Sequence, residues 1–168
     1  MNIPNLLMVP FPAQGHVNPL MNLSQKLVEH GCKITFVNTE FIQKRVMSSM
    51  AKEESLNESA IKLVSIPDGL GAEDDRSDVG ELCVSILNTM PAMLEKLIED
   101  IHLNSDDKIT GIIADGIMGW ALEVGSKLGI KGLLFWPASA AIFALQYNIP
   151  TLIQDAIIDS HGKRIIFH

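Results

Sequence analysis

His16 is the residue of this sequence best placed to do acid–base chemistry. It lies in a segment rich in Pro and Gly that directly follows the apolar run Leu6–Val9. A strand that leads through such a segment into a helix delivers side chains to the carboxyl edge of a parallel sheet, where α/β proteins bind ligands. An imidazole titrates near neutral pH, so His16 is a candidate general base.

Asp115 is the residue expected to work with His16. It ends the apolar run Ile112-Ile113-Ala114, just before a helix expected from about Ile117. In a doubly wound sheet of strand order 3-2-1-4-5, the first and fourth strands are neighbours, and the crevice at their carboxyl ends is the topological switch point. We therefore predict that His16 and Asp115 meet at this crevice.

A histidine–aspartate pair of this kind is expected to deprotonate a substrate group rather than a nucleophile of the protein. A carboxylate on one imidazole nitrogen fixes the tautomer and stabilises the imidazolium as it forms. No serine or cysteine nucleophile is evident beside His16, so the base better suits a substrate hydroxyl. Two structural alternatives stay open: Asp115 could cap the helix that follows it, and His16 could satisfy nearby loop carbonyls.

The elements that must position this pair follow from the apolar pattern. Short β-branched runs alternate with longer helical patterns, which predicts an α/β fold with a Rossmann-like, doubly wound parallel sheet. The near-continuous hydrophobicity of these runs fits strands that are covered on both faces. The expected strands are Asn5–Val9, Lys33–Asn38, Ile61–Ile66, Ile109–Ala114 and Gly132–Trp136.

Helices are expected between these strands. The first should be capped by Asn18, carry Pro19 in its first turn and end at Gly31. The third is expected over residues 78–101, and Pro91 should kink or split it. The others are expected over about 40–50 with Thr39 as the cap, after Asp115, and from about Pro137.

The composition indicates one globular domain and argues against several classes of partner. The 168 residues are 47% hydrophobic and 20% charged, with a net charge of −7. The acidic balance argues against nucleic-acid binding, which needs clustered Lys and Arg. No apolar run approaches the roughly 18 residues that span a bilayer, and no secretory signal is evident. Cys32 and Cys83 are expected to be reduced and buried in a cytoplasmic protein.

Common cofactor and metal motifs are missing from the sequence. The segment after the first strand carries Gly15 as its single glycine, so a dinucleotide pyrophosphate could not approach that backbone in the usual way. Neither a P-loop GxxxxGK(S/T) nor an HExxH motif occurs. We therefore expect no metal and no bound cofactor.

A long acidic segment, residues 67–78, separates the third strand from the third helix. We interpret it as a solvated surface connection, because segments of this composition usually run over the surface. A mobile flap over a pocket is the alternative.

Four segments of this chain resemble plant family 1 UDP-glycosyltransferases. They occur in the family's order and spacing, from the first strand to about Gly162, and the first is the most specific. The segments are Val9-Pro10-Phe11-Pro12-Ala13-Gln14-Gly15-His16-Val17-Asn18-Pro19-Leu20, Ile66-Pro67-Asp68-Gly69-Leu70, Ile113-Ala114-Asp115 and Gly119-Trp120-Ala121-Leu122-Glu123-Val124.

The resemblance implies a GT-B fold, in which two Rossmann-like domains face each other across a cleft. This chain would be the N-terminal, acceptor-binding half. The implied reaction transfers a sugar, usually glucose, from a UDP-sugar to a hydroxyl of a small lipophilic acceptor such as a flavonoid or other phenolic. It proceeds with inversion and requires no metal.

The resemblance also implies roles for individual residues. His16 would remove the acceptor proton, and Asp115 would orient the imidazole and offset its developing charge. Gln14 and Gly15 would line the mouth of the acceptor site. Ser139 would lie near the donor sugar and phosphates, although many relatives carry a hydroxyl about two positions earlier.

The sequence departs from the family in its C-terminal part. The family's donor-binding signature, a Trp-rich segment with His-Cys-Gly-Trp-Asn-Ser, does not occur. Residues 163–168 do not resemble the family's continuation, and we interpret them as a read-through or frame-shifted tail, with an ordinary strand as the alternative. Residues 1–168 are thus expected to form a single incomplete N-terminal domain, without the UDP-sugar-binding domain and inactive alone.

Two other outcomes stay open. The chain could be a non-catalytic module that binds a small hydrophobic ligand, or one that pairs with a C-terminal domain or a full-length homologue. It could also fold poorly, because a missing domain would leave apolar helix and sheet surface uncovered, and such patches promote association.

Overall fold

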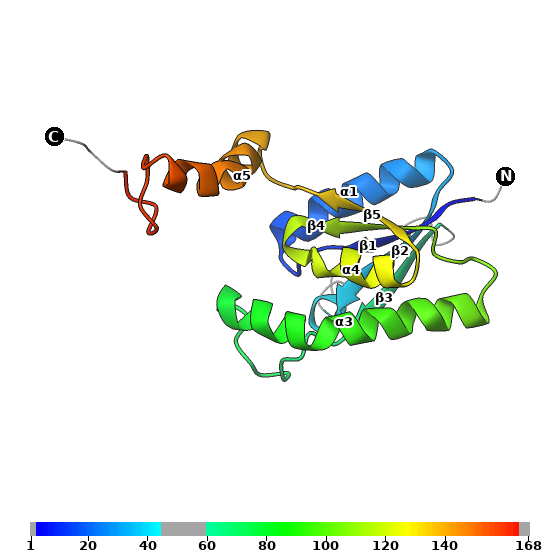
Figure 1. Ribbon diagram of the computed structural model, residues 1–168. Coiled ribbons are helices and arrows are strands. Elements are labelled where there is room, and N and C mark those ends of the chain that lie inside the picture. The colour runs from blue at the N-terminus through cyan, green and yellow to red at the C-terminus, as the bar shows by residue number, and fades with distance from the viewer. Residues whose placement is uncertain (1–2, 45–59, 165–168) are drawn as a thin grey trace. The chain divides into compact units, whose positions relative to one another are not determined.

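The computed structural model describes residues 3–44 and 60–164, which divide into two units, Met1–Pro137 and Ala138–His168. The first unit contains a parallel sheet with helices on both of its faces (Figure 1). The second contains the helix α5, Ala140–Gln154. The two units are described separately below.

The sheet of the first unit has five strands in the order β3-β2-β1-β4-β5, and every neighbouring pair is parallel. This confirms the predicted α/β class and the predicted order 3-2-1-4-5. Each predicted strand exists, and its ends lie within two residues of the observed ones. The strands are β1 Asn5–Val9, β2 Lys33–Thr39, β3 Ile61–Ile66, β4 Gly111–Asp115 and β5 Lys131–Phe135.

Two apolar clusters cover the central strands, one on each face of the sheet. Leu7 and Val9 of β1 belong to the cluster that α3 and α4 cover, whereas Met8 belongs to the cluster that α1 covers. Successive side chains of a strand point to opposite faces, so β1 is buried on both. This explains the continuous apolar runs in the sequence and fixes the sheet as doubly wound.

The first helix, α1, spans Gln14–Glu29, and its N-cap is Ala13. The prediction that Asn18 caps it was wrong, because the carbonyl of Ala13 already accepts the N–H groups of His16 and Val17, both at 2.9 Å. Helical winding thus starts well before Pro19, which lies inside the helix. His16 consequently sits in the first turn of a helix, where its backbone position is fixed.

The helix α3 spans Val79–Asn104 without interruption, so of the two outcomes predicted at Pro91, a kink or a split, the split was wrong. A proline inside a helix costs about 3 kcal/mol. Five fully buried side chains at helical spacing contribute about 1.5–3 kcal/mol each, which outweighs that cost. They are Leu82, Ile86, Met90, Leu94 and Ile98.

The remaining predicted helices also form. Residues 40–44 are helical, and the Thr39 Oγ1 accepts the N–H of Ile42 at 3.3 Å, as expected of the predicted cap. The predicted continuation to about residue 50 lies outside the described residues. After Asp115 the chain forms a 3₁₀ turn, Gly116–Met118, and then α4, Trp120–Lys127.

The two cysteines are free, but Cys32 and Cys83 are each only partly buried. The prediction that they are buried was therefore wrong. Cys32 follows the end of α1, and Cys83 lies on α3 beside the main apolar cluster. Both contact the core from its margin.

Apolar surface is uncovered in each unit, as the sequence led us to expect. In the first unit Leu133 and Leu134 of β5 are 67% and 48% exposed. In the second unit α5 has no buried residue, although its sequence is largely apolar. Of the predicted tail, residues 165–168 lie outside the described residues, and Arg164 forms an isolated antiparallel bridge with Ile158.

None of the helices within residues 3–44 and 60–164 combines the length and the apolar character needed to cross a membrane.

Gly69, just after β3, is held in a conformation that a side chain would strain. Its φ is +88°, and an added Cβ would meet the Thr89 and Ser85 hydroxyls and lie 3.1 Å from the Ser85 carbonyl oxygen of α3. We expect Gly69→Ala to lower the free energy of unfolding by about 2–3 kcal/mol, measured by urea denaturation. Gly15→Ala, which meets open space inside α1, is the control and should be neutral or stabilising. Equal stabilities of the two variants would contradict this account.

Candidate active site

The sheet topology brings the first turn of α1 beside the end of β4. β1 and β4 are adjacent, and Val9 is paired with Ala114, so both strands end at the same edge of the sheet. There the Nδ1 of His16 lies 2.8 Å from the Oδ2 of Asp115. The predicted meeting of these two residues at the switch point is confirmed.

Asp115 is completely buried and uses both carboxylate oxygens. Oδ2 faces His16, while Oδ1 accepts the backbone N–H of Ile117 at 3.0 Å. The carboxylate therefore caps the turn that follows β4, as the first structural alternative proposed, and it also contacts the histidine. The cap fixes the carboxylate, and the carboxylate fixes the imidazole.

The contact with Asp115 decides which nitrogen of His16 can act as a base. A carboxylate can only accept a hydrogen bond, so Nδ1 is the donor in this contact, and in the neutral imidazole Nε2 then keeps its lone pair. Among the described residues no hydrogen bond uses Nε2, and the His16 side chain is 28% exposed. The edge of the Phe11 ring packs against the imidazole, with 5.3 Å between the ring centroids. The imidazole is thus held in one orientation, with no hydrogen bond to Nε2 among the described residues.

A cavity of about 770 Å³ lies at the same edge of the sheet, and we call it the α1–loop cavity. It is walled by the start of α1, by Thr39, Phe41 and Ile42 after β2, by residues 74–77 and by Leu82 of α3. Its size is that of cavities that hold small molecules. Gln14, Val17 and Asn18 of α1 line it, whereas His16 is not among its described lining residues.

The other sequence-predicted site residues occupy different places. Gln14 lines the α1–loop cavity, whereas Gly15 is not among its lining residues and has open space where a Cβ would be. Ser139 belongs to the second unit, where its Oγ accepts the N–H of Ile142 at 3.3 Å and caps α5. Its expected place near the donor stays a prediction.

The acidic segment 67–78 is held by a residue that the sequence interpretation missed. Arg76 donates to both oxygens of the Asp68 carboxylate, from Nε at 2.8 Å and from Nη2 at 3.0 Å. Asp68 is 3% exposed, so the solvated-surface interpretation was wrong for this pair, although most of the segment is exposed. The hydrogen bonds to Asp68 raise the pKa of the Arg76 guanidinium above its usual value. The signal available in the sequence was one arginine among five acidic residues.

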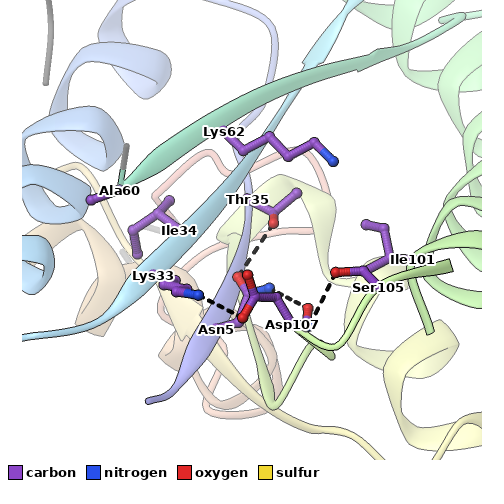
Figure 2. Close-up of a pocket in the computed structure, with 9 residues that line it drawn as sticks. All are labelled: Asn5, Lys33, Ile34, Thr35, Ala60, Lys62, Ile101, Ser105 and Asp107. Atoms are coloured by element: carbon purple, nitrogen blue, oxygen red, sulfur yellow. Dashed lines mark hydrogen bonds and ion pairs between the residues drawn. The ribbon is translucent and has the colours of Figure 1, made fainter. Parts of the chain in front are cut away.

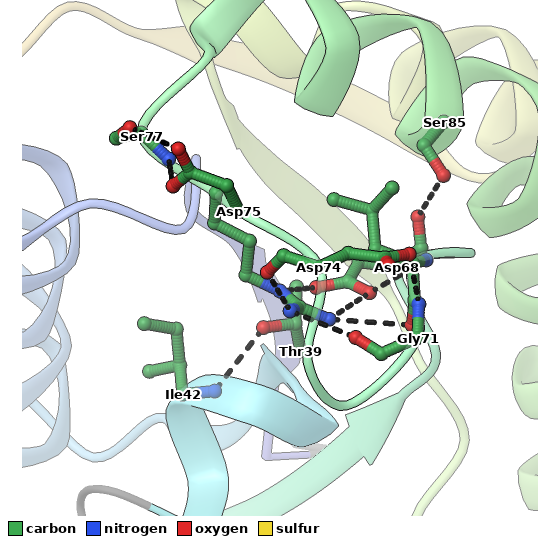
Figure 3. Close-up of polar contacts among 10 residues, drawn as sticks. Thr39, Ile42, Asp68, Gly71, Asp74, Asp75, Ser77 and Ser85 are labelled. Carbon is green, nitrogen blue, oxygen red and sulfur yellow. Dashed lines mark hydrogen bonds and ion pairs between the residues drawn. The ribbon is translucent and has the colours of Figure 1, made fainter.

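The rest of the segment is ordered around this pair. Figure 3 shows the carboxylates of Asp68, Asp74 and Asp75 turned toward neighbouring backbone and side-chain donors. The Arg76 guanidinium also stacks over the Phe41 ring, 4.2 Å from its centroid. Residues 74–77 of this segment form one wall of the α1–loop cavity.

A second cavity, of about 300 Å³, lies at the opposite, amino edge of the sheet (Figure 2). Its polar groups serve the fold: Asn5 donates to the Asp107 carbonyl at 2.7 Å and accepts from Thr35 at 3.3 Å. Lys33 forms an ion pair with the Asp107 carboxylate. These contacts join the starts of β1 and β2 to the turn before β4. They lie at the opposite end of the strands from His16.

Comparison with known proteins supports the resemblance seen in the sequence. Residues 5–68 match the family model "Glycosyltransferase, N-terminal domain". The chain is 42% identical over 167 residues to UDP-glycosyltransferase 83A1 of Arabidopsis thaliana, covering 96% of this chain and 36% of that protein. It is 37% identical over 140 residues to (R)-mandelonitrile beta-glucosyltransferase of Prunus dulcis, covering 82% of this chain and 29% of that protein.

Solved structures share the fold. UDP-glucose:anthocyanidin 3-O-glucosyltransferase in complex with UDP matches with a TM-score of 0.76 and 24% identity, over 95% of this chain and 35% of that one. Os79 of O. sativa in complex with UDP matches with a TM-score of 0.71 and 20% identity, over 91% and 36%. The chain spans about a third of the length of the relatives it matches. It is similar to the N-terminal part of plant UDP-glycosyltransferases, and its parallel sheet matches that of their GT-B fold.

Proposed function

We propose that this chain supplies the acceptor-binding half and the general base of an inverting UDP-glycosyltransferase, most simply a glucosyltransferase. The observation that carries the proposal is the hydrogen bond between His16 Nδ1 and the buried Asp115 carboxylate, which leaves Nε2 open at the carboxyl edge of the sheet. The relatives support the sugar class, since those named by their reaction are glucosyltransferases.

The proposed reaction uses each group of the pair once. Nε2 of His16 removes the proton of an acceptor hydroxyl, and the acceptor oxygen forms a bond to the anomeric carbon of the UDP-sugar. The bond from that carbon to the UDP oxygen breaks, and UDP leaves with the electron pair. Asp115 stabilises the imidazolium that forms. No metal ion and no cofactor takes part in this scheme.

The acceptor is proposed to be a small lipophilic molecule with a hydroxyl, such as a flavonoid or other phenolic. The α1–loop cavity supports this class, because its walls combine apolar side chains with the exposed amides of Gln14 and Asn18. Gln14 and Gly15 stand at the mouth in this proposal, and Ser139 stands on the donor side. The two free cysteines accord with a proposed cytoplasmic location.

A chimera tests the proposal. Residues 1–162 of this chain replace the matching N-terminal part of UDP-glycosyltransferase 83A1, and the product is assayed with UDP-glucose and a panel of phenols and alcohols. We expect a glucoside in mass spectra and release of UDP, whereas residues 1–168 alone give neither. The unaltered relative controls for the assay. A folded chimera that binds UDP-glucose but glucosylates no member of the panel would overturn the proposal.

The same experiment addresses a second candidate, a non-catalytic module that pairs with a C-terminal domain or a full-length homologue. The exposed Leu133 and Leu134 of β5 favour a covering partner. Under this alternative, residues 1–168 bind the relative in size-exclusion chromatography, and the chimera stays inactive.

A further inference from the structure

We propose that the α1–loop cavity selects neutral hydroxylated acceptors and rejects anionic ones such as carboxylates. The inference rests on the proposed function for the identity of the ligand as an acceptor. Its basis is the charge of the cavity wall. Among the described lining residues the one cation uses all its donors, and the two carboxylates beside it form no ion pair.

Arg76 is the cation in the wall, and its donors are all used. A guanidinium has five N–H donors. Two bond Asp68, and the other three bond the carbonyl oxygens of Leu70, Gly71 and Asp74 at 3.0–3.3 Å. The charge of Arg76 is balanced by Asp68, so the guanidinium offers an incoming anion neither a free donor nor a net positive charge.

Asp74 and Asp75 give the wall its net charge. Asp74 Oδ2 accepts the Gly71 N–H at 2.7 Å, and Asp75 accepts the N–H and the hydroxyl of Ser77 at 2.8 and 2.7 Å. The Ser77 donors lower the pKa of the Asp75 carboxyl, so Asp75 is ionised at neutral pH. No cation pairs with either carboxylate among the ion pairs of the described residues.

The start of α1 contributes a positive potential to the cavity, which would attract an anion, but this contribution is smaller than that of the two carboxylates. Its N-cap, Ala13, provides no side-chain hydrogen bond, and its first turn has no acidic residue. A helix N-terminus acts like about half a positive charge. Two full negative charges at the same cavity exceed it, so the net potential repels an anion.

The proposed reaction is consistent with this selectivity. A hydroxyl holds its proton at neutral pH and needs a base to become a nucleophile, whereas a carboxylic acid is already ionised. The base and the acidic wall therefore favour the same class of acceptor.

Paired probes with one aromatic ring test the inference. The dissociation constants of coniferyl alcohol and of ferulate, its carboxylate counterpart, are measured for residues 1–168 by ligand-observed NMR at low and high salt. We expect the alcohol to bind about five- to tenfold more tightly at low salt and the ratio to shrink in 0.5 M salt, about 50 times the ionic strength of a 0.01 M buffer.

Two double variants test whether Asp74 and Asp75 cause the preference for the alcohol over ferulate. Asp74→Asn with Asp75→Asn removes two charges from the wall while keeping the acceptor oxygens, and the ratio should fall below about twofold because ferulate binds more tightly. Asp100→Asn with Asp106→Asn changes the net charge equally, but these exposed residues lie at the end of α3 and in the turn before β4. That control should leave the ratio unchanged.

The outcomes separate this inference from the proposed function. Equal binding of the two probes, or a ratio that the Asp74 and Asp75 changes do not move, overturns the inference even if the chimera is active. No binding of either probe overturns the cavity as the acceptor site. An inactive chimera together with selective binding of the alcohol contradicts the proposed function and leaves the selectivity established.

Discussion

Replacing His16 by alanine in the chimera is expected to lower kcat/KM for glucoside formation by about 1,000-fold, because a positioned general base contributes about 10²–10⁴ to the rate. The loss should fall on kcat, since the cavity walls that bind the acceptor are unchanged. Steady-state kinetics with UDP-glucose and one phenolic acceptor measure it. Activity within about tenfold of the unaltered chimera would remove His16 from this role.

A matched variant separates the base from the structural role of the same residue. His16→Ala leaves the buried Asp115 Oδ2 without its partner, which costs about 1.5–3 kcal/mol of stability. His16→Asn keeps an N–H near the position of Nδ1 but has nothing in place of Nε2. We therefore expect both variants to lose activity and only the alanine variant to lose stability as well.

The sheet and the His16–Asp115 pair could be predicted because both follow from local pattern and topology. Strands such as Asn5–Val9 are short apolar runs bounded by turn residues, and a doubly wound sheet leaves few orders for them. Once β1 and β4 are neighbours, the residues that follow Val9 and Ala114 must meet at one edge. The pairing at 2.8 Å was thus implied by residues far apart in the sequence.

The predictions that were wrong have a common physical cause: contacts between residues far apart in the fold outweigh the preferences of the local sequence. Pro91 was expected to kink or split its helix, but α3 is not split there, because its buried stripe outweighs the cost of one proline. Asp68 belongs to a segment of acidic, turn-forming residues, but its ion pair with Arg76 joins residues eight positions apart in a geometry that no local spacing reveals. The α1–loop cavity, which Arg76 helps to line, was therefore not predictable from the sequence.

The second large effect on activity is expected from replacing Asp115. Asparagine is the most informative replacement, because it changes the contact with His16 but keeps the contact with Ile117. The asparagine side chain would retain an oxygen for the Ile117 N–H, so the cap and the fold should survive. Its amide nitrogen would face His16 and donate to Nδ1. The imidazole would then carry its proton on Nε2, which is the nitrogen that must accept the acceptor proton. We expect Asp115→Asn in the chimera to lower kcat/KM by about 10²–10⁴-fold, with little change in thermal stability.

Asp115→Ala provides the contrast. It removes both hydrogen bonds of the carboxylate, so the cap of the turn at Gly116–Met118 is lost and the free energy of unfolding should fall by about 1 kcal/mol or more. Activity should fall at least as far as in the asparagine variant. An asparagine or alanine variant that retains activity would show that Asp115 acts as a cap and does not orient the base.

The tautomer itself can be observed without any turnover, which makes this the sharpest test of the pair. Long-range ¹H–¹⁵N correlation spectra of residues 1–168 distinguish a protonated from an unprotonated imidazole nitrogen. We expect His16 to carry its proton on Nδ1 in the unaltered chain and on Nε2 in Asp115→Asn, while the exposed His30, which contacts the Lys26 carbonyl, is unchanged. The same tautomer in both chains would mean that Asp115 does not set the base, whatever the kinetics of the chimera. A switch confined to His16 would link the buried carboxylate to the nitrogen that accepts the proton.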